Sequence, residues 1–171
     1  MHRAPSSIDP AELTRQLSAC TSLDAALQLV LDATIALLSA DYGNIQLYRG
    51  GQLLIMCHRG FKENFLNVFG RVSVDDDCAC GRALREGRPV VIPDVELDPQ
   101  FAPFRAVAAE AGYRAVQSTP LVTSGGHFVG MMSTHFARPH APSKDEMVLT
   151  GSYARQLADA VQKFVAAAVV S

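Results

Sequence analysis

Two neighbouring segments in the C-terminal half of the chain are predicted to be strands that are apolar on both faces. They are "YRAVQSTPLV" (113–122) and "FVGMMSTHF" (128–136), which are joined by the tight turn "TSGGH". Because side chains alternate between the two faces of a strand, adjacent apolar residues such as Met131 and Met132 must lie on opposite faces. A sheet built on this hairpin therefore has to be covered on both sides, which requires three layers.

A second hairpin and two long helices precede and follow these strands. The stretch "GNIQLYRGGQLLIMCHRGF" (43–61) alternates polar and apolar residues on either side of the Gly50-Gly51 turn. Residues 22–39 and 143–166 repeat apolar residues at helical spacing. We therefore expect an α+β fold with three layers, in which helices flank a five- or six-stranded, largely antiparallel sheet.

Shorter elements lie between the two hairpins. The segments "KENFLNVFG" (62–70) and "CACGRALREG" (78–87) are predicted to be short helices, and Asp77 and Gly87 are expected to begin and end the second one. "RPVVIPDV" (88–95) is predicted to be a short buried strand. A loop then leads into a helix that ends at Gly112.

Length and composition indicate one soluble domain. Residues 1–7 are expected to be a flexible tail and residues 8–168 a single domain, because 171 residues leave little room for a second one. A net charge of −2 gives no basic surplus for nucleic acid, and no apolar run approaches the about 20 residues of a membrane span. We expect a cytoplasmic protein whose four cysteines are free thiols, with no contact to a membrane.

An ordered series of short segments resembles the GAF domain of bacterial sensor histidine kinases and related signalling proteins. The segments are "GNIQLY", "HRGF", "CGRALREGRPVVIPDV", "DPQFAPFRAVAAEAGYRAVQSTPLV" and "GGHFVGMMSTHFARPHAPS", within about residues 22–166. The resemblance implies that the terminal helices cover one sheet face and that a pocket lies on the other, closed by residues 75–85 and 94–111. GAF domains bind cyclic nucleotides, bilins, haem, small metabolites or no known ligand, so the ligand stays open.

The candidate ligand-binding residues come from the segments that close the pocket and from polar positions within the apolar strands. Aromatic residues in a Pro-rich loop suit an apolar lid, and buried polar groups in a strand need partners that a ligand can supply. Core packing of the aromatic residues and hydrogen bonds from the polar ones to helix ends are the alternatives, and periodicity does not decide which strand residues face the pocket. The candidates are Cys80, Asp94, Phe101, Phe104, Gln117, Thr119 and Thr134.

Neither a reactive thiol nor a metal site is predicted from the cysteines. Negative charge at residues 75–77 raises the pKa of a nearby thiol, and a spacing of two places Cys78 and Cys80 on different sides of a helix, so that Cys80 turns into the core. A zinc site with Cys57 and His58 is disfavoured because adjacent strand residues point to opposite faces. We expect no metal and no cofactor, and a lone buried His135 is expected to be a hydrogen-bonded core residue.

The functional prediction is a non-enzymatic sensory or regulatory domain of bacterial signal transduction, including two-component systems, that binds an unidentified small molecule or a signalling partner. A homodimer through the terminal helices is expected, because "VAAAVV" after Phe164 adds apolar surface. One alternative is a thiol-dependent reductase of small oxidised metabolites such as free methionine sulfoxide. A GAF relative with that activity has a thiol in a "CG" like Cys80-Gly81, but the loop between residues 94 and 112 contains no partner cysteine. The other alternative is a filled cavity in a domain that only mediates assembly.

Overall fold

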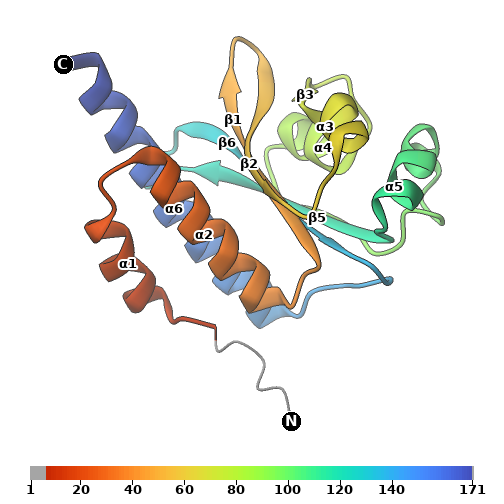
Figure 1. Ribbon diagram of the computed structural model, residues 1–171, viewed down its shortest axis with the longest axis horizontal. Helices are drawn as coiled ribbons and strands as arrows, with labels where there is room; N and C mark the ends of the chain where they lie inside the picture. Colours follow the sequence, from red (N-terminus) through yellow and green to blue (C-terminus); the bar gives the residue numbers. More distant parts are fainter. Residues whose placement is uncertain (1–6, 171) are drawn as a thin grey trace.

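A curled antiparallel sheet forms the middle layer of the protein in a computed structural model that describes residues 7–170 (Figure 1). Its six strands follow the order β3-β2-β1-β6-β5-β4. The strands are β1 (Tyr42–Arg49), β2 (Gln52–Arg59), β3 (Arg71–Val72), β4 (Val90–Ile92), β5 (Ala115–Val122) and β6 (Phe128–Phe136). Both predicted hairpins and the predicted antiparallel sheet are thus confirmed, while the two-residue β3 was not predicted.

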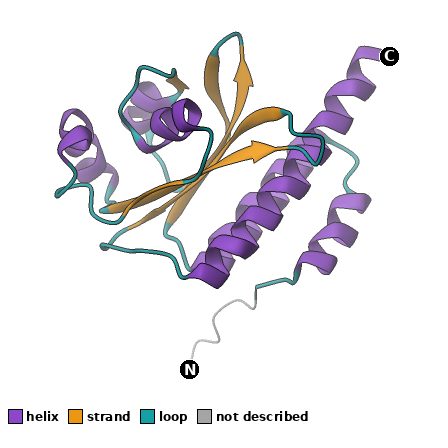
Figure 2. Ribbon diagram, turned by 180° about the vertical axis from the view of Figure 1, so that it is seen from behind, coloured by secondary structure: helices purple, strands orange, loops and turns teal. Residues whose placement is uncertain are grey.

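Helices cover both faces of this sheet, as Figure 2 shows from behind. The helices α1 (Pro10–Ala19), α2 (Leu23–Leu38) and α6 (Lys144–Val170) pack on one face, which we call the helix face. On the other face lie α3 (Glu63–Phe69), α4 (Ala79–Glu86), the 3₁₀ helix η1 (Pro99–Phe104) and α5 (Arg105–Ala111), which together form the roof layer. This arrangement confirms the α+β fold with three layers.

Side chains at the helix ends explain where the helices begin and end. Ser143 and Glu146 bond reciprocally at the start of α6, with distances of 3.1 and 2.7 Å between the backbone nitrogens and side-chain oxygens. Gly87 ends α4 in the left-handed conformation, at φ 67°, as its sequence position predicts. The prediction for the other end of α4 was wrong by one residue, because Cys78 and not Asp77 is the N-cap.

The two sheet faces bury separate apolar clusters. Met132, Leu31 and Tyr153 belong to the cluster between the sheet and the helix face. Met131 and Phe65 belong to the cluster between the sheet and the roof layer. The adjacent residues Met131 and Met132 therefore cover opposite faces, as the strand pattern predicted.

The chain ends lie at the margins of this core. The predicted tail, residues 1–7, lies outside the described residues except for Ser7. At the other end, the last turns of α6 project beyond the sheet, and Val169 is 81% exposed (Figure 2). Among residues 7–170, no helix combines the length and apolarity needed to cross a membrane.

Candidate functional site

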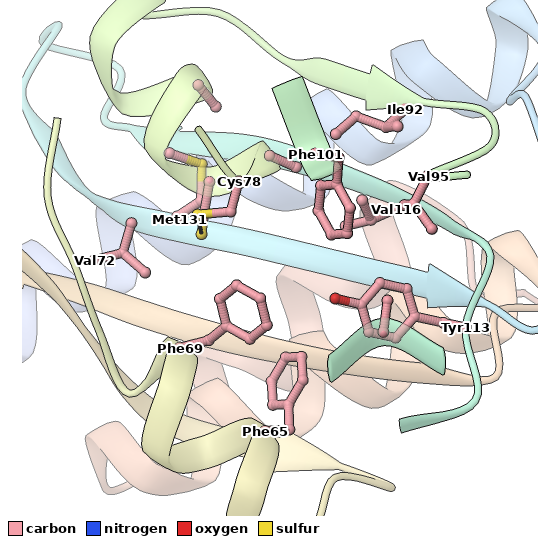
Figure 3. Close-up of a cluster of buried hydrophobic side chains, with 14 of the residues drawn as sticks. Phe65, Phe69, Val72, Cys78, Ile92, Val95, Phe101, Tyr113, Val116 and Met131 are labelled. Carbon is pink, nitrogen blue, oxygen red and sulfur yellow. Dashed lines mark hydrogen bonds between the residues drawn. The ribbon is translucent and has the colours of Figure 1, made fainter. Parts of the chain in front are cut away.

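A small cavity lies between the sheet and the roof layer, inside the cluster that Figure 3 shows. Its volume is about 20 Å³, which is the space of about one water molecule. Aromatic rings and thiols from the roof layer face polar side chains from the strands across this space. The lining residues are Asn44, Gln46, Phe65, Phe69, Cys78, Ala79, Cys80, Phe101, Tyr113, Val116, Ser118, Ser133 and His135.

The floor of the cavity is a row of polar residues across three neighbouring strands. Asn44 on β1 is opposite Ser133 on β6, which is opposite Ser118 on β5. The hydroxyl oxygens of Ser118 and Ser133 are 2.7 Å apart and hydrogen-bonded. Strand register therefore brings polar groups that lie up to 89 residues apart in sequence to one place below the roof layer.

Three polar atoms in this lining are buried and have no hydrogen-bond partner. They are Oδ1 of Asn44, Oε1 of Gln46 and Nδ1 of His135. The amide nitrogen of Gln46 donates to the backbone oxygen of Phe69 at 3.4 Å, so only its carbonyl oxygen lacks a partner. An unsatisfied buried polar group destabilises the fold by about 1–3 kcal/mol, and such groups are rare in native proteins.

His135 is enclosed by aromatic rings. The centroid of its ring lies 4.6 Å from that of Tyr113, 4.8 Å from that of Phe61 and 5.6 Å from that of Phe65. Burial lowers the pKa of His135 to about 3. The ring is therefore neutral at physiological pH, and its nitrogens offer one donor and one acceptor. The predicted burial of His135 is confirmed, whereas Nδ1 lacks the predicted hydrogen bond.

Cys78 and Cys80 lie together at the start of α4. Their sulfur atoms are 3.4 Å apart, and both side chains are buried. The expectation that they point in different directions was wrong, because Cys78 precedes the helix in an extended conformation, with φ −68° and ψ 165°. Only Cys80 is helical, so the helical spacing rule does not apply to the pair.

A buried ion pair joins α4 to η1 in the roof layer. The guanidinium of Arg82 donates to both carboxylate oxygens of Asp98 at 2.8 and 2.9 Å and to the backbone oxygen of Asp77 at 2.6 Å. Asp98 also accepts from the backbone nitrogen of Phe101 at 3.1 Å. The hydrogen bond from Arg82 is the main cause that lowers the pKa of Asp98. This pair therefore fixes the two roof segments that carry Cys80 and Phe101.

Two of the seven predicted ligand-binding residues, Cys80 and Phe101, line the cavity. Phe104 lies beside it and packs its ring 5.6 Å from that of Phe101. Asp94 lies outside and pairs with Arg114 at 2.7 Å, and this hydrogen bond lowers the pKa of Asp94.

The three predicted strand residues do not face the cavity. Gln117 bonds to the sulfur of Met147 on α6 at 3.5 Å, and Thr119 is opposite Met132, which packs on the helix face. Thr134 is opposite Gln117 in the same ladder and shares its side of the sheet. The polar residues of the cavity floor are one position away from the predicted ones, at Ser118 and Ser133.

Sequence reasoning also missed Asn44 and Gln46. Both lie in the first strand of the predicted hairpin, where the alternation with apolar residues was used only to predict the strand. They are 3% and 1% exposed, because α3 and α4 cover this face. Polar residues that alternate with apolar ones in a strand indicate a buried binding site only when the sheet face that carries them is known to be covered.

An open pocket of about 270 Å³ adjoins the cavity between α3 and α5. Phe65 lines both spaces. Tyr42, Lys62 and Glu110 contribute polar groups to the open pocket. The ring of Phe65 is therefore the candidate barrier between the two spaces.

Cys57, which was considered as a zinc ligand together with Cys78 and Cys80, lies apart from that pair. Cys57 packs in the cluster on the helix face, whereas Cys78 and Cys80 lie on the roof side of the sheet. Burial raises the pKa of the Cys57 thiol to about 11.

Comparison with known proteins identifies the family. The family model described as "GAF domain" matches residues 20–162. No curated protein is similar enough in sequence to count as a relative.

Solved structures share the fold at low sequence identity. The GAF domain of a phosphoenolpyruvate-protein phosphotransferase from Coxiella burnetii has a TM-score of 0.78 and 19% identity, with 96% of this chain and 99% of that chain covered. A domain of a protein described as a two-component sensor histidine kinase, from Sinorhizobium meliloti 1021, has a TM-score of 0.69 and 22% identity, with 88% and 97% covered. The free methionine-R-sulfoxide reductase of Neisseria meningitidis, solved with its substrate, has a TM-score of 0.76 and 17% identity, with 98% and 99% covered.

Proposed function

Because this chain belongs to the GAF domain family, we propose that it is a non-enzymatic sensory domain whose small-molecule ligand binds between the sheet and the roof layer. The observation that carries the proposal is the set of three unpartnered polar atoms, on Asn44, Gln46 and His135, that line one cavity. Buried groups without partners destabilise a fold, and a ligand that bonds to them offsets that loss.

The lining restricts the chemistry of the ligand. Among residues 7–170, no Asp, Glu, Lys or Arg side chain lines the cavity, and His135 is neutral, so an ionised ligand would meet no counter-charge. The amides of Asn44 and Gln46 and the hydroxyls of Ser118 and Ser133 supply both donors and acceptors. Aromatic rings suit the flat faces of a conjugated ligand. We therefore propose an uncharged, planar molecule with hydrogen-bonding groups, such as an amide or a nitrogen heterocycle.

Binding requires the roof layer to move. A space of about 20 Å³ admits about one water molecule, so an organic ligand has to displace a side chain. Phe65 is the side chain that we propose moves, because its displacement adds the adjoining pocket of about 270 Å³. A change in roof packing on binding is what a sensory domain needs, since a ligand shifts a conformational equilibrium only through different contacts in the two states.

Two buried glutamines provide a matched test of this site. Gln46 and Gln117 are 1% and 2% exposed, and each has an unpartnered carbonyl oxygen, but they lie on opposite faces of the sheet. Thermal unfolding is measured with a panel of uncharged amides, purines and pyrimidines, in the presence of a thiol reductant. A compound that binds the native state raises the melting temperature.

We expect Gln46→Leu to abolish the thermal shift that a panel compound causes in the parent protein and Gln117→Leu to retain it. Mass spectrometry of the purified protein under native conditions tests for a co-purified ligand. If no compound shifts the melting temperature and no ligand co-purifies, or if both variants lose the shift equally, the cavity is not the binding site. The first of these results would favour a domain that only mediates assembly.

The second part of the proposal is a homodimer that passes the signal through the terminal helices. Val148 and Val169 on α6 are 71% and 81% exposed, and the last turns of α6 project past the sheet (Figure 1). Exposed apolar side chains on a helix favour association between copies when a partner helix covers them. A monomer in light scattering at high protein concentration would refute this part.

We also propose a cytoplasmic location and a signalling role of the kind that two-component proteins perform.

One observation favours the alternative function, thiol-dependent reduction of small oxidised metabolites such as free methionine sulfoxide. The missing partner thiol for Cys80 is supplied locally by Cys78, whose sulfur lies 3.4 Å away. This function predicts turnover of methionine sulfoxide with a thiol reductant and its loss in Cys80→Ser. The sensory function predicts no turnover by either protein.

A further inference from the structure

We propose that Cys78 and Cys80 are a redox-active dithiol that closes to a disulfide, and that hydrogen peroxide is the oxidant that reaches it. The proposal deepens the sensory function, on which its signalling consequence rests, by assigning a chemical input to the same cavity. Disulfide formation itself requires only the two thiols and the peroxide, and it does not depend on a ligand in the cavity.

The geometry of the pair is close to that of a disulfide. The sulfur atoms are 3.4 Å apart, so they have to approach by roughly 1.3 Å to reach the disulfide length of about 2.05 Å. Cys78 is the N-cap of α4, so its backbone nitrogen lies outside the helix and only its backbone oxygen takes part in the helical hydrogen bonds, from Arg82 at 3.0 Å. The two remaining cysteines lie elsewhere, since Cys57 and Cys20 pack on the helix face. Each thiol of the pair therefore has the other as its reaction partner.

The surroundings favour Cys78 as the attacking sulfur. The hydrogen bond from the thiol of Cys80 lowers the pKa of Cys78, against the effects of burial and of the charge on Asp76. The expectation that the aspartates at residues 75–77 raise the pKa of this thiol was therefore wrong for the net direction of the shift. The pKa of Cys80 is raised by that same hydrogen bond and by burial, so Cys80 keeps its proton. Thiolate character raises the rate of attack on a peroxide oxygen, and a neighbouring thiol then resolves the product.

The size of the cavity selects the oxidant. Cys78 and Cys80 are 2% and 8% exposed, and the space beside them has a volume of about 20 Å³. Hydrogen peroxide is among the few oxidants that approach the size of a water molecule. Bulkier hydroperoxides would have to displace the roof layer before they reached either sulfur.

The reaction balances with hydrogen peroxide as the only oxidant. The Cys78 thiolate attacks one peroxide oxygen, the O–O bond breaks, and hydroxide leaves and takes a proton to become water, which yields a sulfenic acid on Cys78. The sulfur of Cys80 then attacks the sulfur of Cys78, the S–O bond breaks, and the Cys80 proton leaves with the oxygen in a second water. The two thiols lose two electrons, which the peroxide gains. A dithiol reductant reverses the change by thiol–disulfide exchange.

The thiol pair is linked through Arg82 to η1, another segment of the roof layer. The backbone oxygen of Cys78 accepts from the backbone nitrogen of Arg82 at 3.0 Å, and the side chain of Arg82 binds Asp98 on η1. Movement of Cys78 toward Cys80 therefore acts on the residue that joins α4 to η1. Oxidation is expected to change roof packing and, through it, the cavity.

A single tryptic peptide reports the proposed bond. Cleavage after Arg71 and Arg82 releases residues 72–82, which contain Cys78 and Cys80 and no other cysteine. The folded protein is treated with hydrogen peroxide, denatured, alkylated and digested. We expect this peptide to carry no alkyl group and to have lost two hydrogens, whereas Cys20 and Cys57 should each be alkylated. Treatment with a dithiol before alkylation should restore both thiols.

Two variants make the assignment specific. Cys80→Ser should accumulate a sulfenic acid on Cys78 that dimedone traps, whereas Cys57→Ser should behave like the parent protein. Full alkylation of all four cysteines after peroxide treatment would overturn the proposal, as would a sulfinic acid on Cys80 or a bond between chains. The ligand tests above use reduced protein, so a failure of ligand binding leaves this result unaffected, and absence of the disulfide leaves ligand binding intact.

Discussion

Replacement of Arg82 by methionine removes the buried ion pair of the roof layer while it keeps a side chain of similar length. The side chain of Arg82 is 8% exposed and that of Asp98 is 23% exposed. Breaking a buried ion pair destabilises a protein by about 3–5 kcal/mol. Because water can rehydrate the partly exposed carboxylate of Asp98, we expect the lower end of that range, about 3 kcal/mol.

Equilibrium unfolding in urea measures this change. With a slope of about 2 kcal/mol per molar urea, a loss of about 3 kcal/mol lowers the midpoint by about 1.5 M. Arg114→Met is the control, because Arg114 also donates two hydrogen bonds to a carboxylate, at 3.1 and 2.7 Å to Asp94, but its side chain is 37% exposed. Asp94 is 13% exposed, but the guanidinium of Arg114 keeps its contact with water, so we expect a loss closer to the value of about 0.2–1 kcal/mol that exposed pairs contribute. Equal losses in the two variants would refute the reasoning that burial makes the Arg82 pair strong.

The stability that the Arg82–Asp98 pair contributes depends on pH, and the direction follows from the pKa of Asp98. Arg82 lowers the pKa of Asp98 below its unfolded value of about 3.9. A carboxyl with a lowered folded pKa adds stability above its unfolded pKa and loses that contribution as pH falls through the folded pKa. The difference between the parent protein and Arg82→Met should therefore shrink in acid below about pH 4.

Three further outcomes are expected. Burial lowers the pKa of His135 to about 3, so as pH falls the unfolded chain binds a proton before the native state does. The free energy of unfolding should therefore fall by about 2 kcal/mol from pH 7 to pH 5 in the parent protein, whereas His135→Asn should not show this loss. Gly81→Ala should destabilise strongly in thermal unfolding, since its Cβ would overlap the backbone oxygen of Asp76, whereas Gly151→Ala in α6 has open space and should stabilise by about 0.5–1 kcal/mol. Phe65→Ala should join the cavity to the open pocket and raise the affinity for any compound that binds there, and unchanged affinity in calorimetry would contradict its role as the barrier.

Local patterns in the sequence were sufficient for the elements and their order. The Gly50-Gly51 turn and the stop at Gly87 are properties of neighbouring residues, so they could be predicted without tertiary contacts. The β5–β6 hairpin is apolar on both faces, and this pattern alone required three layers, which the fold confirms.

The identity of the site residues depended on contacts between distant segments. A strand that is covered on both faces has no polar side, so its period of two cannot distinguish Ser118 from Gln117, and only the register with β6 and the position of the roof layer decided which one faces the cavity. The contact between Cys78 and Cys80 likewise follows from the extended backbone of one residue at the start of α4, which no helical periodicity describes. The sequence by itself thus determined the layers and the family. Tertiary packing alone decided which polar atoms are left without partners, because the burial of a residue depends on the segments that cover it and not on its neighbours in the chain.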